Sequence, residues 1–202
     1  MRNTTRRRTA ATIAGAVALI AAGCATDGKG VASSSAYSSA ASVSSSVPAR
    51  PAKPVKVKGA DGSMVTLTGP IAARYAAATH TEKKSLGVAL TGDRNAGTRA
   101  SGVVFQQFQG GAIVAKNDDA GTPAYIISGK IREAWNVQRD TAGVPSDTGT
   151  NGSAGPLGVV TSDETAVGGQ LVTTFEHGKV AYNTTTGQVE VTVNGNSVPS
   201  GL

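Results

Sequence analysis

Few side chains in this sequence combine the type and the spacing that catalysis requires. Its two histidines, His80 and His177, would each need a nucleophile and an orienting acid to act as a catalytic base. The nearest approach to a Gly-x-Ser-x-Gly nucleophile turn is residues 151–155, which begin with Asn instead of Gly. The sequence also lacks a His-Glu-x-x-His zinc motif and a Gly-Lys-Ser/Thr phosphate loop. It therefore predicts a protein that is not an enzyme and carries no cofactor.

Carboxylates in two polar loops are candidates for ligand binding. Asp163 is followed by Glu164, and Asp93 stands at the equivalent place of an earlier copy of the same pattern. Such carboxylates either bind sugar hydroxyls or a cation, or they cap backbone N–H groups at a helix start or turn, which the local sequence favours. Asp118 and Asp119 lack the ligand spacing of a calcium loop, so no metal site is predicted.

The aromatic residues fall into two groups. Tyr125 and Tyr182 flank predicted hairpin turns, where a ring is either exposed to stack on a sugar or packed, and both are candidate ligand-binding residues. The other group has helical and repeat-locked spacing, which predicts a place in the core: Tyr75, Phe108, Trp135 and Phe175.

Residues 1–23 have the features of an export signal. A basic start with Arg2 and residues 6–8 precedes an apolar run, residues 10–22, that is too short to span a bilayer. Small residues then lead to Cys24, the single cysteine of the chain, and this ending resembles the lipobox of bacterial lipoproteins. The resemblance implies cleavage before Cys24 and a diacylglyceryl group on its thiol. It implies a lipid-anchored protein of the cell envelope, on the outer face of the cytoplasmic membrane.

The net charge of the whole chain, +6, does not describe its predicted folded part. From Gly59 onward, the chain contains ten Lys and Arg residues and twelve Asp and Glu residues. A nucleic-acid-binding protein concentrates positive charge on its folded face, so no nucleic-acid partner is predicted. Residues 24–54 are mostly Ser, Ala and Pro and have too few large apolar side chains for a core, which predicts a disordered tether.

Residues 55–202 are numerous enough for one domain with its own core. The predicted fold is α+β, with three hairpins and two short helices arranged in repeated units. The hairpins are expected over residues 55–67, 112–127 and 179–193, where alternating apolar residues surround a Gly-containing turn. A helix is predicted after each of the first two hairpins, the first with Pro70 at its first position after Gly69 and the second with Ile131 and Trp135 on one face, and residues 140–155 are predicted to be a surface loop.

One order of residues recurs along this domain. In its full copy, Leu86-Gly87 is followed by Phe-Gln-Gly-Gly at 108–111, the middle hairpin and a Gly-x-Ile-x-x-x-Trp sequence that ends at Trp135. One partial copy begins at Leu157-Gly158, and the end of another reaches Tyr75. This order resembles the LGFP repeat of actinobacterial envelope proteins, although Val-Ala and Val-Val replace the Phe-Pro of the name.

The resemblance implies a module that binds a cell-wall glycan, in the arabinogalactan or peptidoglycan layer, through its repeats. The expected partners are then the membrane, through the lipid at Cys24, and the wall polymer. An accessory lipoprotein that binds an envelope enzyme or transporter is the alternative. The ligand-binding candidates under this reading are Asp93, Tyr125, Asp163 and Tyr182.

Overall fold

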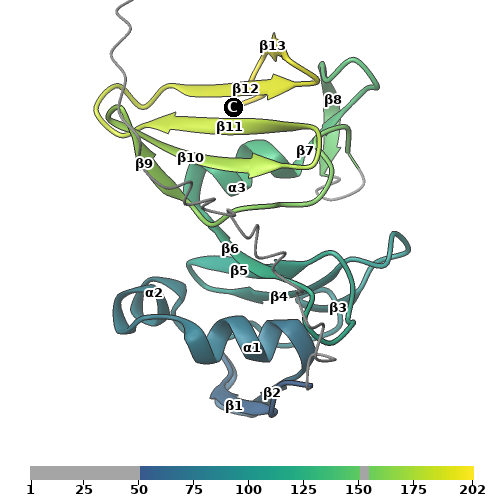
Figure 1. Cartoon of the computed structure of the whole chain (residues 1–202), viewed down its shortest axis with the longest axis vertical. Coiled ribbons are helices and arrows are strands. Elements are labelled where there is room, and N and C mark those ends of the chain that lie inside the picture. Colours follow the sequence, from purple (N-terminus) through teal and green to yellow (C-terminus); the bar gives the residue numbers. More distant parts are fainter. Residues whose placement is uncertain (1–50, 151–154) are drawn as a thin grey trace, which may run out of the picture. The chain divides into compact units, whose positions relative to one another are not determined.

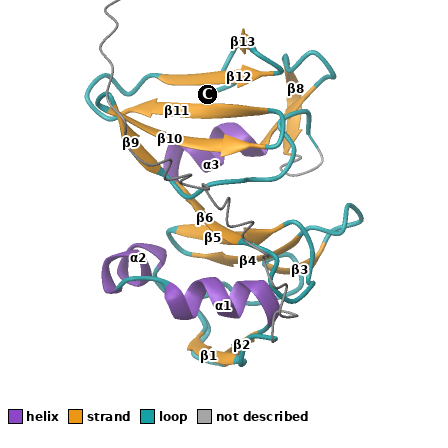
Figure 2. Ribbon diagram, in the orientation of Figure 1, coloured by secondary structure: helices purple, strands orange, loops and turns teal. Residues whose placement is uncertain are grey.

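The computed structural model of the protein describes residues 51–150 and 155–202. The predicted lipidation site Cys24, the signal segment 1–23 and most of the tether 24–54 therefore lie outside the described residues. The described chain forms three successive units of strands and helices (Figure 1 and Figure 2). Within these described ranges, no helix has the length and apolar character needed to cross a membrane.

The first unit is a hairpin followed by two helices. Strand β1 (Val55–Lys58) pairs antiparallel with β2 (Met64–Leu67). Helix α1 (Gly69–Ala77) has Pro70 in its first turn, where the missing N–H of proline leaves no helical hydrogen bond unmade. Helix α2 (His80–Leu86) follows almost at once. The hairpin and α1 confirm the sequence prediction for this unit.

Helix α2 corrects the prediction of only two short helices. Its sequence has no apolar stripe, so periodicity does not reveal it. A reciprocal capping box holds its first turn instead: the Glu82 N–H donates to the Thr79 hydroxyl (3.2 Å), and the Thr79 N–H donates to the Glu82 carboxylate (2.7 Å). The Thr-x-x-Glu spacing of this box is readable in the sequence.

The second unit is an antiparallel sheet with the strand order β3, β4, β5, β6. These strands are β3 (Ala96–Thr98), β4 (Val104–Phe108), β5 (Gly111–Ala115) and β6 (Ala124–Ser128). The predicted middle hairpin is β5 and β6, and helix α3 (Gly129–Asn136) follows it as predicted. Strand β7 (Val137–Arg139) then pairs with β8 (Pro145–Thr150), so part of the predicted loop 140–155 is a strand. Its Gly- and Thr-rich sequence lacks the apolar alternation that would have indicated one.

The third unit is a five-stranded antiparallel sheet with the order β13, β12, β11, β10, β9. Its strands are β9 (Thr165–Val167), β10 (Gln170–Phe175), β11 (Gly178–Asn183), β12 (Val189–Val193) and β13 (Asn196–Val198). The predicted last hairpin is β11 and β12. Val191 and Val193 point into the core, whereas Lys179 and Glu190 are exposed on the opposite face.

A residue with a positive φ angle begins each of the two repeat helices, α1 and α3, and another stands in the turn between β12 and β13. Gly69 and Gly129, the first residues of α1 and α3, have φ angles of 53° and 50°, and Asn194 after β12 has a φ of 49°. Asn is the non-glycine residue that best tolerates this left-handed conformation. Gly195 follows with a φ of 82°, and two successive positive φ angles make a tight hairpin turn instead of a helix. The third unit therefore continues into β13.

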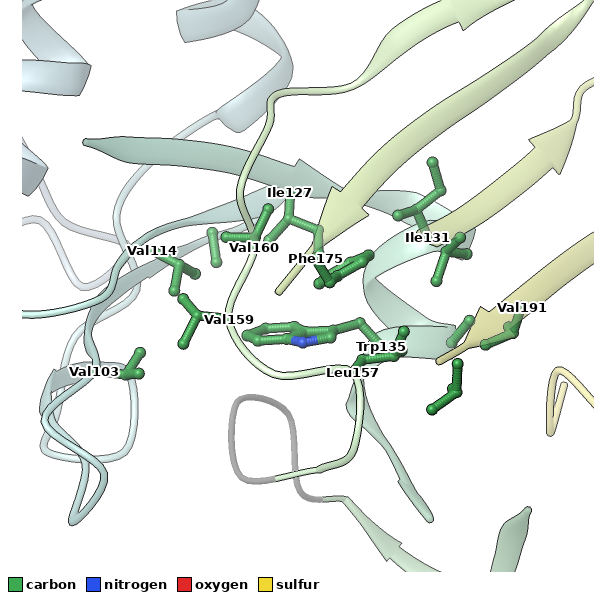
Figure 3. Packing of buried hydrophobic residues seen from close by; sticks show 14 residues of the cluster. Val103, Val114, Ile127, Ile131, Trp135, Leu157, Val159, Val160, Phe175 and Val191 are labelled. Atoms are coloured by element: carbon green, nitrogen blue, oxygen red, sulfur yellow. The ribbon is translucent and has the colours of Figure 1, made fainter. Parts of the chain in front are cut away.

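Each repeat helix packs on the sheet of the following unit. Helix α1 contacts β5 and β6, and α3 contacts β11 and β12. The Tyr75 ring of α1 stacks on Phe108 of β4, with ring centroids 5.7 Å apart. The Trp135 ring of α3 stacks in the same way on Phe175 of β10, at 6.0 Å. Figure 3 shows Trp135 next to Phe175, with Leu157 and Val159 close by.

The middle sheet separates two apolar clusters because both of its faces are covered. One cluster contains Phe108 and Ile113 and packs them against Ile71 of α1. The other contains Val114 and Ile127, which share the opposite face of the sheet, and joins them to the core of the third unit. In the third sheet the larger buried side chains of β11 and β12 (Val180, Val191 and Val193) lie on one face, and on the other face of these two strands only Ala181 is buried, so this sheet closes the series.

Gly110 and His177 occupy equivalent turns of the second and third units. The Gly110 N–H donates to the carbonyl of Leu86 (2.9 Å), and the His177 N–H donates to the carbonyl of Leu157 (3.0 Å). A Cβ atom at position 110 would lie 1.9 Å from the backbone oxygen of Ser85 in α2, so this turn requires glycine. His177 is exposed, and among the described residues of the third unit that precede its turn there is no helix like α2.

We expect Gly110→Ala to lower the free energy of unfolding by about 2–4 kcal/mol, because the new methyl group collides with backbone that cannot move aside locally. The matched variant His177→Ala should change it by less than about 0.5 kcal/mol. Urea denaturation of both variants measures the difference. Equal effects at the two positions would show that the turns do not differ in this way.

Candidate functional site

The aromatic residues predicted to be core are used for packing and are largely closed to a ligand. Phe108, Trp135 and Phe175 are 1%, 7% and 5% exposed, which confirms the prediction for these three, and Tyr75 is half-buried. The Trp135 indole N–H donates to the carbonyl of Gly158, at 2.9 Å, in the Leu-Gly pair that opens the next unit. Trp135 therefore fixes the position of α3 relative to the third unit, and with it the polar residues of α3.

Asp163 joins the three units to one another. Its carboxylate accepts a hydrogen bond from the backbone N–H of Ile126 in β6 (2.7 Å), and it forms an ion pair with Arg74 of α1 (3.1 Å). The prediction of helix-start or turn capping is wrong for this residue, because both partners lie in other units. The carboxylate of Glu82 in α2 also pairs with Arg74.

Arg74 is consequently a cation held between two carboxylates. Burial alone would lower its pKa, but the hydrogen bonds and charges of Glu82 and Asp163 outweigh burial and raise the pKa above the ordinary value. The Arg74 guanidinium and the backbone and hydroxyl of Thr79 lower the pKa of Glu82 to about 2. We name these three side chains, Arg74, Glu82 and Asp163, the inter-unit clasp.

The clasp borders a recess of about 200 Å³ that also includes Glu164. Glu164 is exposed as a whole, but partial burial of its carboxyl raises its pKa above the ordinary value. Among the described residues, no group of three or more His, Cys, Asp or Glu side chains is arranged to hold a metal ion. Three carboxylates line the recess, and two of them, those of Glu82 and Asp163, are already paired with Arg74.

The four predicted ligand-binding residues do not line one common pocket. Asp163 belongs to the clasp, whereas Asp93 is exposed at the rim of a separate recess of about 460 Å³. Tyr125 in β6 and Tyr182 in β11 are half-buried and pack against the same apolar cluster from two different sheets. Neither tyrosine is among the residues that line the recesses of Asp93 and Asp163.

The recess of Asp93 is lined by side chains that the sequence analysis did not name as candidates. It is lined by polar and aromatic residues of β4, α3 and the loops beside β3, and it adjoins a smaller hollow of about 30 Å³ through four shared residues: Arg99, Phe105, Gln107 and Asn136. These residues come from separate elements, so no local motif unites them. The alternation of Phe105 and Gln107 in β4 was the one readable signal, because it places both on the same face.

The clasp gives the protein a pH-dependent stability whose sign follows from Glu82. Its pKa is lower in the folded protein than in the unfolded chain, so its contribution is complete above about pH 4.5 and is lost as the pH falls toward 2. We expect Glu82→Gln to cost about 1 kcal/mol at pH 7, a figure reduced for its partial exposure to solvent. The difference from wild type should shrink steadily below pH 4.5.

Chemical denaturation at several pH values between 7 and 2 measures this difference. Asp163→Asn should also destabilise the protein at pH 7, whereas Asp93→Asn, an exposed aspartate of the equivalent loop, should have almost no effect. A Glu82→Gln variant with the same pH dependence as wild type would contradict the role given to the clasp.

A comparison with known protein families finds a match that lies within the second unit. Residues 86–143 match the LGFP repeat, from the Leu-Gly pair through the sheet and α3 to the turn after β7. No curated protein matches the chain. The match contains Asp93 and the recess that it borders, whereas Asp163 and Tyr182 lie in the following unit. The chain is therefore an LGFP-repeat-containing protein, with its repeat at residues 86–143.

Proposed function

We propose that this protein is a non-enzymatic, lipid-anchored module of the cell envelope that binds a cell-wall glycan through its LGFP repeat. The observation that carries the proposal is the repeat at residues 86–143, whose family suggests a module of the cell surface or envelope. The lipobox-like sequence before Cys24 supports export and anchoring on the outer face of the cytoplasmic membrane. The Ser-, Ala- and Pro-rich segment 24–54 would then serve as the spacer between membrane and wall.

The arrangement of the units supports this role in a second way. The third unit repeats the Leu-Gly pair, the stacked Phe and the turn of the second unit, but the outer face of its sheet is mostly polar. Terminal units with a polar outer face close repeat arrays and keep them soluble. The sheet of the second unit is covered on both faces, and an open recess lies on this unit.

Co-sedimentation with purified cell-wall material tests the proposal. The mature chain, residues 24–202 with Cys24→Ser, should sediment in a saturable way with insoluble peptidoglycan or with the arabinogalactan–peptidoglycan complex. Heat-denatured protein provides the control for nonspecific adsorption. If the folded chain stays in the supernatant with both materials, the glycan role is wrong and a protein partner in the envelope becomes the better proposal.

The anchor is tested separately with the full precursor. Cys24→Ala should abolish incorporation of a fatty-acid label and move the protein out of the membrane fraction, because no other cysteine can accept the lipid. Gly23→Ala keeps a small residue before the cysteine and should preserve labelling. A Cys24→Ala precursor that is still labelled would exclude this residue as the lipidation site.

A further inference from the structure

A cleft on the LGFP repeat collects arginine side chains beside β4. We name it the arginine cleft and define it by six residues that line the two adjoining recesses described above: Arg94, Arg99, Phe105, Gln107, Arg132 and Asn136. Asp93 at the rim is the one acidic residue among those that line it. From Gly59 onward acidic residues outnumber basic ones, so this cluster is a local feature and not part of a generally basic surface.

The fold brings these side chains together from β4, α3 and the loops on either side of β3, with Arg94 in the loop before β3. Phe105 and Gln107 share one face of β4, because alternate residues of a strand point the same way. Arg132 and Asn136 are four residues apart and lie on one face of α3. Arg99 stands in the turn between β3 and β4, where its backbone is held by a hydrogen bond from its N–H to the carbonyl of Val103 (2.8 Å).

Neutral groups fix two of the arginines without neutralising them. The Arg99 guanidinium lies over the Phe105 ring, 4.8 Å from its centroid. Arg132 donates from Nη2 to the side-chain oxygen of Gln107, at 2.7 Å. Among the described side chains, no carboxylate lies within ion-pair distance of Arg94, Arg99 or Arg132.

The other partly or fully buried arginines of the described chain have more partners than Arg132, although the Nε of Arg139 is buried without one. Arg74 has two carboxylate partners, and Arg139 donates to four backbone carbonyls: those of Ala134, Gly143, Pro199 and Ser200. Arg132 is half-buried, and burial lowers its pKa, yet one amide oxygen is its only partner among the described residues. A guanidinium has five N–H donors and stays charged, so most of the Arg132 donors have no partner within the described residues.

Packing does not explain the polar residues of α3. Helix α1 has the same place in the preceding unit, since Gly69 and Gly129 begin the two helices with matching φ angles and Tyr75 and Trp135 make matching stacks. Counted from these pairs, Ala72 and Ala76 of α1 correspond to Arg132 and Asn136 of α3. Alanine is therefore sufficient for a helix in this position, and the polar pair in α3 needs another reason.

We propose that the arginine cleft binds an acidic sugar, with its oxyanion group between Arg99 and Arg132. The guanidinium fork matches the geometry of a carboxylate or phosphate group. Asn136 has no hydrogen-bond partner among the described residues, so its amide can pair with ring hydroxyls, as can the carboxylate of Asp93. A recess of about 460 Å³ is within the usual range for a small ligand. This inference rests on the proposed glycan-binding function and narrows it to a wall component that carries an oxyanion.

The inference also predicts one site per chain. Counted from the equivalent Phe108 and Phe175, the third unit has Val172 and Thr174 where the second has Phe105 and Gln107. The third unit continues into β13 instead of a helix, so it has no counterpart of Arg132 or Asn136. Binding should therefore saturate at one sugar for each protein molecule.

Isothermal titration calorimetry of the mature Cys24→Ser chain tests the cleft with matched probes. The probes are a short oligogalacturonate, its fully methylated ester, glucose 1-phosphate and inorganic phosphate. We expect one-to-one binding of at least one acidic sugar, no heat from the methyl ester, and weaker binding as salt rises. Arg132→Gln and Arg99→Gln should each weaken binding about tenfold or more, while Lys179→Gln, an equal charge change on the third sheet, should not.

Stability measurements separate binding from a structural role. Because Arg132 is a half-buried charge with a single neutral partner among the described residues, Arg132→Gln should unfold at the same temperature as wild type or higher. A clear loss of stability would show that Arg132 is structural and would overturn the inference. Three other results would also overturn the inference. The methyl ester could bind as well as the acid, or inorganic phosphate alone could bind as well as the sugar phosphate. A folded chain that binds neither acidic sugar is the third.

Wall co-sedimentation of the same variants distinguishes failure of the cleft from failure of the proposed function. Sedimentation that persists in Arg132→Gln would retain the wall role and reject this site. Loss of sedimentation in Arg132→Gln, with Lys179→Gln unaffected, would support both. One-to-one binding of an acidic sugar by a chain that does not sediment with the wall would support the cleft and reject the wall as its location.

Discussion

The stack between a helix of one unit and a phenylalanine of the next is the contact on which this structure depends. An isolated two-stranded hairpin such as β1 and β2 is at best marginally stable in water. By placing Tyr75 on Phe108 and Trp135 on Phe175, each unit completes its core with the sheet that follows. Loss of a buried aromatic ring typically costs about 3–5 kcal/mol, so either stack is a large part of the stability of such a domain. The position of α3, and hence of the arginine cleft, follows from the second stack.

Polar contacts then fix the units at a defined spacing. Asp163 in the third unit contacts Arg74 of the first and the backbone of Ile126 in the second, so a single carboxylate touches all three. Arg139 of β7 has a similar role at the end of α3. Its guanidinium donates to the carbonyl of Ala134 in that helix and to the carbonyls of Pro199 and Ser200. Arg74 and Arg139 each have several polar partners within the fold, whereas Arg132 has one amide oxygen and Arg99 lies over the Phe105 ring.

The sequence predicts the elements better than the site because the two depend on different ranges of contact. Alternating valines and the Gly69-Pro70 start reveal hairpins and a helix, since both signals are local. Helix α2 was missed although its capping box is local, because no apolar period accompanies it. The ion pair of Arg74 and Asp163 spans 89 residues, and the cleft joins Arg99 to Arg132 through the register of β4. Neither can be read from spacing, because the ion pair forms only when the first and third units meet, and the cleft forms only when separate elements of the second unit pack together.

Each stacking contact joins the helix of one unit to the sheet of the next, so the units are arranged head to tail along the chain. The first unit gives an aromatic ring and the last only receives one, because Asn194-Gly195 turns the chain into β13 where a further helix would begin. A segment consisting of one receiving sheet and one donating helix, such as residues 86–136, leaves no ring unpaired when it is duplicated in tandem. Gene duplication can therefore lengthen such a protein by whole units at internal positions, while its two ends stay unchanged.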